Sequence, residues 1–152
     1  MLDAEVQRNR IIRIIAATRF PFVDQVEGWP SDYKTIVNDE QKRFGIKGPD
    51  GVVYPSIVIL RGDGVQELGM VERSEDIHEG RAEFWRFLSD CAGVGRKYKK
   101  LFIYVPRGLE EKALKILESN GIEYDGLRGY TVDDRSLKII PIKTHDSPQD
   151  HR

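Results

Sequence analysis

The last third of the chain reads as strand, helix and strand, and this succession restricts the possible folds more than any other feature. Residues 101–105 form an uninterrupted apolar run of a length typical for a buried strand. Residues 109–120 place apolar side chains at helical spacing and stop at a glycine, and residues 127–132 form a second β-rich run. Since a strand–helix–strand unit of this length joins parallel neighbours, the pattern predicts an α/β sheet with a right-handed crossover.

A predicted β-hairpin precedes this unit. Residues 52–60 and 65–72 are rich in β-branched and apolar side chains, and the tight-turn sequence Arg-Gly-Asp-Gly separates them. Residues 137–142 are typical of a final strand. Helices are predicted where a capping residue precedes apolar positions at helical spacing, namely at residues 3–18, 31–44 and 74–91.

These elements predict one α/β domain over residues 1–142, in which residues 1–30 are an N-terminal helix and loop extension. We expect a mixed sheet that combines the antiparallel hairpin with the parallel βαβ unit and is flanked by helices. Residues 143–152 are polar, and we expect them to form a disordered tail.

Composition and charge narrow the function classes. The 152 residues carry a formal net charge of -1, so the sequence lacks the basic bias typical of strong non-specific nucleic-acid binding. The single cysteine, Cys91, excludes an internal disulfide and a cysteine-based zinc cluster. No apolar run reaches the roughly 20 residues that cross a bilayer, and the N-terminus has no secretory pattern. We therefore expect a cytoplasmic protein with no membrane partner.

The predicted hairpin carries the most informative motif. Residues 54–60 read Tyr-Pro-Ser-Ile-Val-Ile-Leu, and residues 68–72 read Leu-Gly-Met-Val-Glu. This pair of strands resembles the PD-(D/E)XK nuclease family, in which Pro-Asp begins one strand and an acidic-x-Lys or acidic-x-Glu triplet lies on the next. In that family a helix, often with a glutamate, precedes the hairpin, and a helix, a strand and a further αβ unit follow it. The order predicted from residue 31 to residue 142 is similar.

The resemblance implies a restriction-endonuclease-like fold and assigns the motif positions. Family members hold Mg²⁺ with carboxylates, and the metal stabilises the charge on the transferring phosphate and activates water. The first carboxylate falls on Ser56, the acidic residue of the triplet on Met70, and the third position on Glu72, where a glutamate is acceptable. A hydroxyl does not supply a carboxylate's charge, and a thioether is a poor ligand for Mg²⁺. Two of the three catalytic positions have therefore lost their chemistry.

Glu40 is the candidate for a rebuilt metal site. It lies on the apolar face of the predicted helix at residues 31–44, where it is similar to the family's helix glutamate. Because a buried carboxylate needs a partner, a Mg²⁺ ion shared by Glu40 and Glu72 would provide one. The alternative is that Glu40 lies at the margin of the face with its carboxylate in water.

One basic cluster is the candidate nucleic-acid contact: Arg96, Lys97, Tyr98, Lys99 and Lys100. Cations interleaved with an aromatic ring are able to contact a nucleic-acid backbone. The alternative is a solvated connector whose charges complement the C-terminus of the preceding helix.

Three functions remain open at this point. The favoured hypothesis is a PD-(D/E)XK-like protein with impaired or absent catalysis that acts as a nucleic-acid-associated or scaffolding domain, or as a homodimer. The second is a working Mg²⁺-dependent nuclease with migrated carboxylates, Glu40 and Glu72. The third is a protein–protein interaction domain with no nucleic-acid role, which the net charge of -1 permits.

Overall fold

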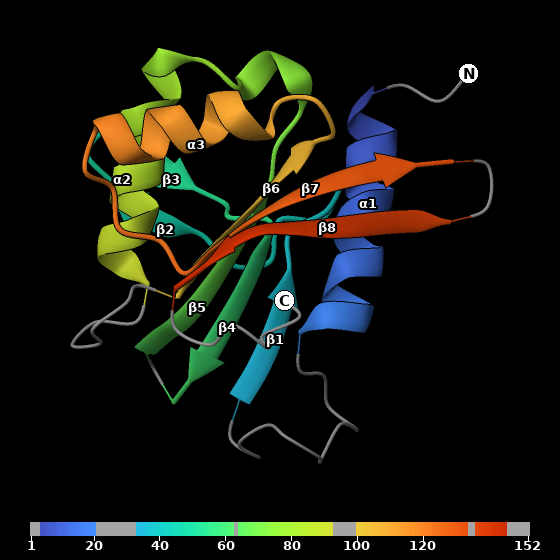
Figure 1. Cartoon of the computed structure of the whole chain (residues 1–152). Helices are drawn as coiled ribbons and strands as arrows, with labels where there is room; N and C mark the ends of the chain where they lie inside the picture. The colour runs from blue at the N-terminus through green and yellow to red at the C-terminus, as the bar shows by residue number, and fades with distance from the viewer. Residues whose placement is uncertain (1–3, 21–32, 63, 93–99, 134–135, 146–152) are drawn as a thin grey trace.

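A six-stranded mixed sheet divides the molecule into two faces (Figure 1). The structure is a computed structural model and describes residues 4–20, 33–62, 64–92, 100–133 and 136–145. Its strands lie in the order β1-β4-β5-β6-β7-β8. Their bounds are β1 Tyr33–Val37, β4 Ile57–Arg61, β5 Gly64–Val71, β6 Leu101–Pro106, β7 Gly126–Val132 and β8 Leu137–Thr144.

Helices and a small second sheet complete the described elements. The helices are α1 Ala4–Arg19, α2 Ala82–Cys91 and α3 Glu110–Ser119, and two 3₁₀ turns, η1 Ser74–Asp76 and η2 Glu79–Arg81, precede α2. The small sheet pairs β2 Ile46–Gly48 with β3 Gly51–Val53. None of the helices in the described part of the chain is long and apolar enough to cross a membrane.

The strand directions bring several strand ends to one edge of the sheet. Strands β1, β4 and β5 pair antiparallel, whereas β5, β6 and β7 pair parallel and β8 returns antiparallel. The predicted hairpin is therefore confirmed as β4 and β5, and the predicted parallel unit as β6, α3 and β7. Because β4 is antiparallel to β5, its start lies at the edge where β5, β6 and β7 end.

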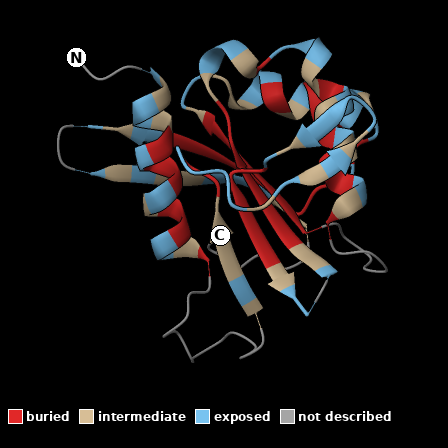
Figure 2. Cartoon of the chain, turned by 180° about the vertical axis from the view of Figure 1, so that it is seen from behind, coloured by how far each residue is buried: buried red, intermediate tan, exposed pale blue. Residues whose placement is uncertain are grey.

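Two apolar cores cover the two faces of the sheet. Helix α1 packs Ile11, Ile12 and Ile15 against one face. Helices α2 and α3 cover the other face, where Trp85 and Leu117 are fully buried. Figure 2 shows the central strands buried along most of their length between these layers. The sheet is therefore packed on both faces.

The predicted helix at residues 31–44 is wrong, because strand β1 occupies its first half. Spaced Tyr, Ile, Val and Phe residues fit a helix, but a short apolar run fits a strand equally well. Asn38 ends the strand, since its side-chain amide donates to the carbonyls of Phe44 (2.8 Å) and Pro55 (2.7 Å). Its side-chain oxygen accepts from the backbone N–H of Arg43 (2.8 Å). These bonds fold residues 38–44 into a loop.

Other element bounds differ less from the prediction. The helix expected at residues 74–91 begins as the two 3₁₀ turns and becomes α-helical at Ala82. The start of the extended run at residues 52–60 belongs to β3 rather than to the hairpin. The last strand continues to Thr144, so residues 143 and 144, which were expected in the tail, belong to it, and residues 146–152 lie outside the described residues.

Candidate functional site

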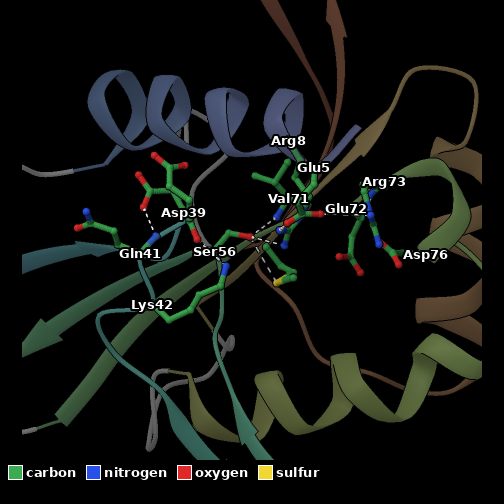
Figure 3. Close-up of polar contacts among 12 residues, drawn as sticks. Glu5, Arg8, Asp39, Gln41, Lys42, Ser56, Val71, Glu72, Arg73 and Asp76 are labelled. Atoms are coloured by element: carbon green, nitrogen blue, oxygen red, sulfur yellow. Dashed lines mark hydrogen bonds and ion pairs between the residues drawn. The ribbon is translucent and has the colours of Figure 1, made fainter. Parts of the chain in front are cut away.

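The first two motif positions, Ser56 and Met70, meet where β4 begins and β5 ends. Figure 3 labels Ser56 there, together with Val71 and Glu72. Ser56 lies one residue before β4, and its hydroxyl donates to the sulfur of Met70 across 3.6 Å. The same hydroxyl accepts from the backbone N–H of Val71 at 3.0 Å. Both side chains are buried, with 0% of Ser56 and 4% of Met70 exposed. The positions that resemble catalytic carboxylates therefore hold a neutral, closed contact.

Helix α1 places a cation next to this contact. The Arg8 guanidinium donates through Nε to the carbonyl of Val71 (2.9 Å) and through Nη2 to the Ser56 hydroxyl (3.4 Å). Glu5, one turn earlier, pairs with the same guanidinium at 3.1 Å. Because the side chain of Arg8 is only 12% exposed, its charge is held at this position. A fixed guanidinium opposes the binding of a second cation beside Ser56.

Glu72, the third motif position, is fully buried and already neutralised. The guanidinium of Arg81 donates to both of its oxygens, through Nε to Oε2 at 2.5 Å and through Nη2 to Oε1 at 2.8 Å. The indole N–H of Trp85 adds a third bond to Oε2 at 2.8 Å. Burial disfavours the Arg81 charge, but the hydrogen bonds and charge of Glu72 outweigh it and raise the pKa of Arg81.

These residues do not fit a Mg²⁺ ion. Magnesium in a protein needs carboxylate oxygens that are free to coordinate it. At Glu72 the ion would have to displace Arg81 or lie in contact with its guanidinium. Within the described ranges, no group of three or more His, Cys, Asp or Glu side chains is placed to hold a metal. Ser56, Met70 and Glu72 thus lie together without a usable set of metal ligands.

Glu40 does not share this site's contacts. It lies in the bend after β1, its side chain is 62% exposed, and it pairs with Arg13 of α1 at 2.8 Å. Its neighbour Asp39 is the buried carboxylate of that loop, and it pairs with Arg13 (3.3 Å) and Arg43 (3.0 Å). Burial raises the pKa of Asp39, but its bonds to the Gln41 N–H and the two arginines together lower it below the usual value. Without the helix, the argument that placed Glu40 beside Glu72 no longer holds.

Lys100 is the one residue of the basic cluster that the structure describes, and its ammonium lies inside the domain. It is 4% exposed and forms an ion pair of 2.7 Å with the fully buried Asp125. An ammonium engaged in this way is not presented to a phosphate backbone. The remaining four residues, Arg96, Lys97, Tyr98 and Lys99, lie outside the described residues, so their contact with nucleic acid stays a prediction.

A cleft of about 340 Å³ opens at the same sheet edge, and the sequence reasoning missed it. Arg8, Arg73, Arg107 and the ring of Tyr130 line it, together with the first turn of α1. The available signal was positional, because Arg73 and Arg107 closely follow two parallel strands, β5 and β6. Ligands of α/β sheets commonly bind in the crevice outside the carboxyl ends of the strands.

The arginines of the cleft are ion-paired. Arg73 contacts Glu5 at 3.2 Å, Asp76 at 3.4 Å and Glu75 at 3.5 Å (Figure 3 shows the first two). Arg107 is more open, with its side chain 60% exposed and Glu110 at 3.5 Å. An anion entering the cleft would exchange partners with these carboxylates. Such an exchange suits reversible, salt-sensitive binding.

Tyr130 links the cleft to Glu72, and its ionisation gives a pH test of this packing. Its hydroxyl donates to the backbone carbonyl of Glu72 at 2.6 Å. Burial raises the pKa of Tyr130 to about 12, since nearby Arg8 lowers it less than burial and the charges of Glu72 and Asp76 raise it. The stability that the neutral phenol contributes is complete below about pH 10 and is lost as the pH rises through the folded-state pKa.

We therefore expect Tyr130→Phe to unfold at a free energy about 1 kcal/mol lower than the wild type near neutral pH. The gap should close as the pH rises above about 10, because the phenol then ionises in the unfolded wild type while it stays protonated in the folded protein, which favours unfolding. Urea denaturation of both proteins at several pH values measures the gap. A difference that stays constant from neutral pH to about pH 11 would contradict the buried, bonded phenol.

Comparison of the chain with protein-family models, with curated proteins and with solved structures found no match. The functional argument therefore depends on the geometry of this sheet edge. That geometry has two parts: the closed contacts of Ser56, Met70 and Glu72, and the arginine-lined cleft beside them.

Proposed function

We propose that the chain is a PD-(D/E)XK-like domain of restriction-endonuclease-like fold that no longer cleaves phosphodiesters and acts by binding nucleic acid. The order of elements supports the fold assignment. Helix α1 precedes the hairpin of β4 and β5, and α2, β6 and the unit of α3 and β7 follow it. This is the layout expected from the resemblance, with α1 in the place that the predicted helix at residues 31–44 was to take.

The observation that carries the loss of catalysis is the bidentate pairing of Glu72 with Arg81. Glu72 is the one acidic side chain at the three hairpin motif positions, and the neighbouring Arg81 guanidinium neutralises its charge. Ser56 and Met70 bond each other and supply no negative charge. A metal-dependent reaction would require a carboxylate centre, and the residues at these positions favour a structural role instead.

The arginine cleft is the proposed place for the phosphate backbone. Guanidinium groups bind phosphate through two parallel N–H bonds, and this geometry is their advantage over lysine. Arg107 is the most accessible of the three arginines, so we assign it the first contact with a phosphate. The absence of a net positive charge predicts modest affinity that falls with salt concentration.

The competing nuclease hypothesis loses its second metal ligand. It required Glu40 and Glu72 to share an ion, but Glu40 is exposed and bound to Arg13, and Glu72 is buried and bound to Arg81. Cleavage by this pair would need both ion pairs to break and the two carboxylates to meet. We therefore favour binding without cleavage.

Binding of fluorescently labelled DNA and RNA, followed by anisotropy with and without Mg²⁺, tests the proposal. We expect salt-sensitive binding that needs no metal and leaves the oligonucleotide intact. Arg107→Glu should weaken binding about tenfold and make it less dependent on salt, because a phosphate contact is lost and a repulsion added. Lys115→Glu, the same charge change on the exposed side of α3, is the matched control and should bind as the wild type does.

Two results would defeat this proposal. The first is Mg²⁺-dependent cleavage that co-purifies with the protein and disappears in Glu72→Gln, which would restore the nuclease hypothesis. The second is binding that is absent at low salt, or equally strong in Arg107→Glu. That result would remove nucleic acid as the ligand of the cleft.

A further inference from the structure

The two outer strands of the main sheet, β1 and β8, form its lateral edges, and these edges differ in their protection against the addition of a new strand. At one edge, β8 carries Pro141 and the exposed Lys138 and Lys143, and its pairing with β7 shifts register beside Arg128. Proline, lysine and irregular pairing are the features by which proteins block edge-to-edge association. At the other edge, β1 reads Tyr-Lys-Thr-Ile-Val and pairs with β4 in regular register, without proline. Within the described residues, the β1 edge therefore lacks most of the protection of the β8 edge.

The hydrogen-bond pattern shows which backbone groups of β1 point outward. The N–H of Asn38 donates to the carbonyl of Ser56 at 2.9 Å, so these two residues form a hydrogen-bonded antiparallel pair. Since such pairs alternate along a ladder, Lys34 and Ile36 bond β4, whereas Thr35 and Val37 turn their N–H and C=O groups away from it. The Val37 carbonyl agrees with this alternation, because it accepts a hydrogen bond from the Arg43 side chain at 2.7 Å rather than from β4.

A groove of about 590 Å³ runs along this edge between β1 and α1. Ala16 and Ala17 form its helix side, and their small side chains leave room for another main chain. Thr35 lines the groove from the strand side. Its hydroxyl oxygen is buried and has no hydrogen-bond partner among the described residues. A buried hydroxyl without a partner is costly, and an added strand would offer it one.

The charges around the groove favour an added strand with acidic side chains. Its lining holds three cations, Arg13, Lys34 and Arg43, against one carboxylate, Asp39. Asp39 is buried and already binds both arginines, and Glu40 outside the lining also pairs with Arg13. Lys34, the second residue of β1, is exposed. An incoming acidic side chain would thus meet an excess of positive charge.

We propose that the β1 edge binds an extended acidic segment of a partner protein as an additional strand of the main sheet. The backbone groups of Thr35 and the N–H of Val37 supply the ladder bonds, Ala16 and Ala17 accept small apolar side chains, and Lys34 pairs with a carboxylate. Strand addition at an exposed edge is a general mode of peptide recognition. A second copy of this chain fits less well, because Arg13, Lys34 and Arg43 would face their own counterparts.

Titration calorimetry of the full chain with a capped peptide of alternating glutamate and valine tests this proposal, with a lysine–valine peptide as the charge control. We expect the acidic peptide to bind and the basic peptide not to bind. Thr35→Pro removes an outward N–H and should abolish binding while the protein still unfolds cooperatively, as proline is tolerated where the N–H faces away from the ladder. Ile36→Pro, one residue on, removes a bond to β4 and should lower stability instead.

Lys34→Glu supplies a variant that leaves the backbone unchanged. It should bind the acidic peptide about fivefold more weakly, because one favourable charge pair becomes a repulsion. It should also gain binding of the basic peptide, because the new glutamate can pair with a lysine. Equal affinity for both peptides, or binding that survives Thr35→Pro and Lys34→Glu, would overturn the proposal. Sedimentation of the free protein as a dimer that Thr35→Pro converts to a monomer would also overturn it, and would assign the edge to a second copy.

Discussion

Arg81→Met is expected to lower the free energy of unfolding by about 3 kcal/mol. The arginine neutralises Glu72, whose side chain is 0% exposed, and methionine leaves that carboxylate with the Trp85 indole as its remaining side-chain donor among the described residues. An uncompensated buried charge is among the most destabilising changes in a protein interior. Because the Arg81 side chain is 22% exposed, water reaches the pair in part, and the loss should fall at the lower end of the usual range.

Urea denaturation with a double-mutant cycle measures this effect. Glu72→Gln removes the charge but keeps an acceptor for Trp85, so Glu72→Gln with Arg81→Met should be more stable than Arg81→Met alone. Arg86→Met, on the exposed side of α2 where the arginine binds the Asn120 carbonyl, is the control and should cost no more than about 1 kcal/mol. A loss below about 1 kcal/mol for Arg81→Met would mean that the Glu72 carboxylate is free for another partner.

Lys100→Met should also destabilise the protein by about 3–5 kcal/mol. The ion pair of Lys100 with Asp125 is more enclosed than that of Arg81, with side-chain exposures of 5% and 0%. It joins the residue before β6 to the residue before β7. The backbone of Asp125 also binds Leu101 and His145, at 2.9 and 2.8 Å. Removal of the ammonium therefore leaves a buried charge at a point where three segments meet.

A matched exposed pair separates this structural role from a surface role. Lys143→Met breaks the ion pair with Glu118, where both partners are about half exposed, and should change stability by no more than about 0.5 kcal/mol. Lys100→Met with Asp125→Leu should recover part of the stability that Lys100→Met loses, since no buried charge remains. If Lys100→Met is as stable as the wild type, the lysine is available at the surface and its predicted contact with nucleic acid regains support.

The parts of the fold that depend on local patterns could be predicted from the sequence. The hairpin, the apolar run of β6 and the amphipathic spacing of α3 each fit one element type, and the structure has them in the expected order. The segment at residues 31–44 failed because its spacing fits both a helix and a strand. The strand is selected over the helix by the pairing of β1 with β4 and by the hydrogen bond from the Asn38 side chain to the Pro55 carbonyl. Both involve residues that are distant in the chain.

The proximity of Ser56, Met70 and Glu72 could be predicted from the sequence, but their ion-pair and hydrogen-bond partners could not. Ser56, Met70 and Glu72 gather where β4 begins and β5 ends, as the alternation of side chains along paired strands implies. The partner of Glu72 was not visible, because the 3₁₀ turns that bring Arg81 back to it have no simple spacing rule. The cleft was equally hidden, since Arg8, Arg73 and Arg107 come from three separate elements. Such convergence follows from the strand order rather than from any local motif.

Titration of Mn²⁺ into the wild-type protein by calorimetry tests our central proposal, that closed contacts at Ser56, Met70 and Glu72 leave no metal centre there. We predict no specific binding at millimolar metal in the wild type or in Glu72→Gln. The double variant Ser56→Asp with Met70→Glu serves as the positive control, because it places two carboxylates where Ser56 and Met70 now touch, and it should gain both binding and metal-dependent stability. Binding to the wild type that disappears in Glu72→Gln would contradict the claim and show that Glu72 still serves a metal ion.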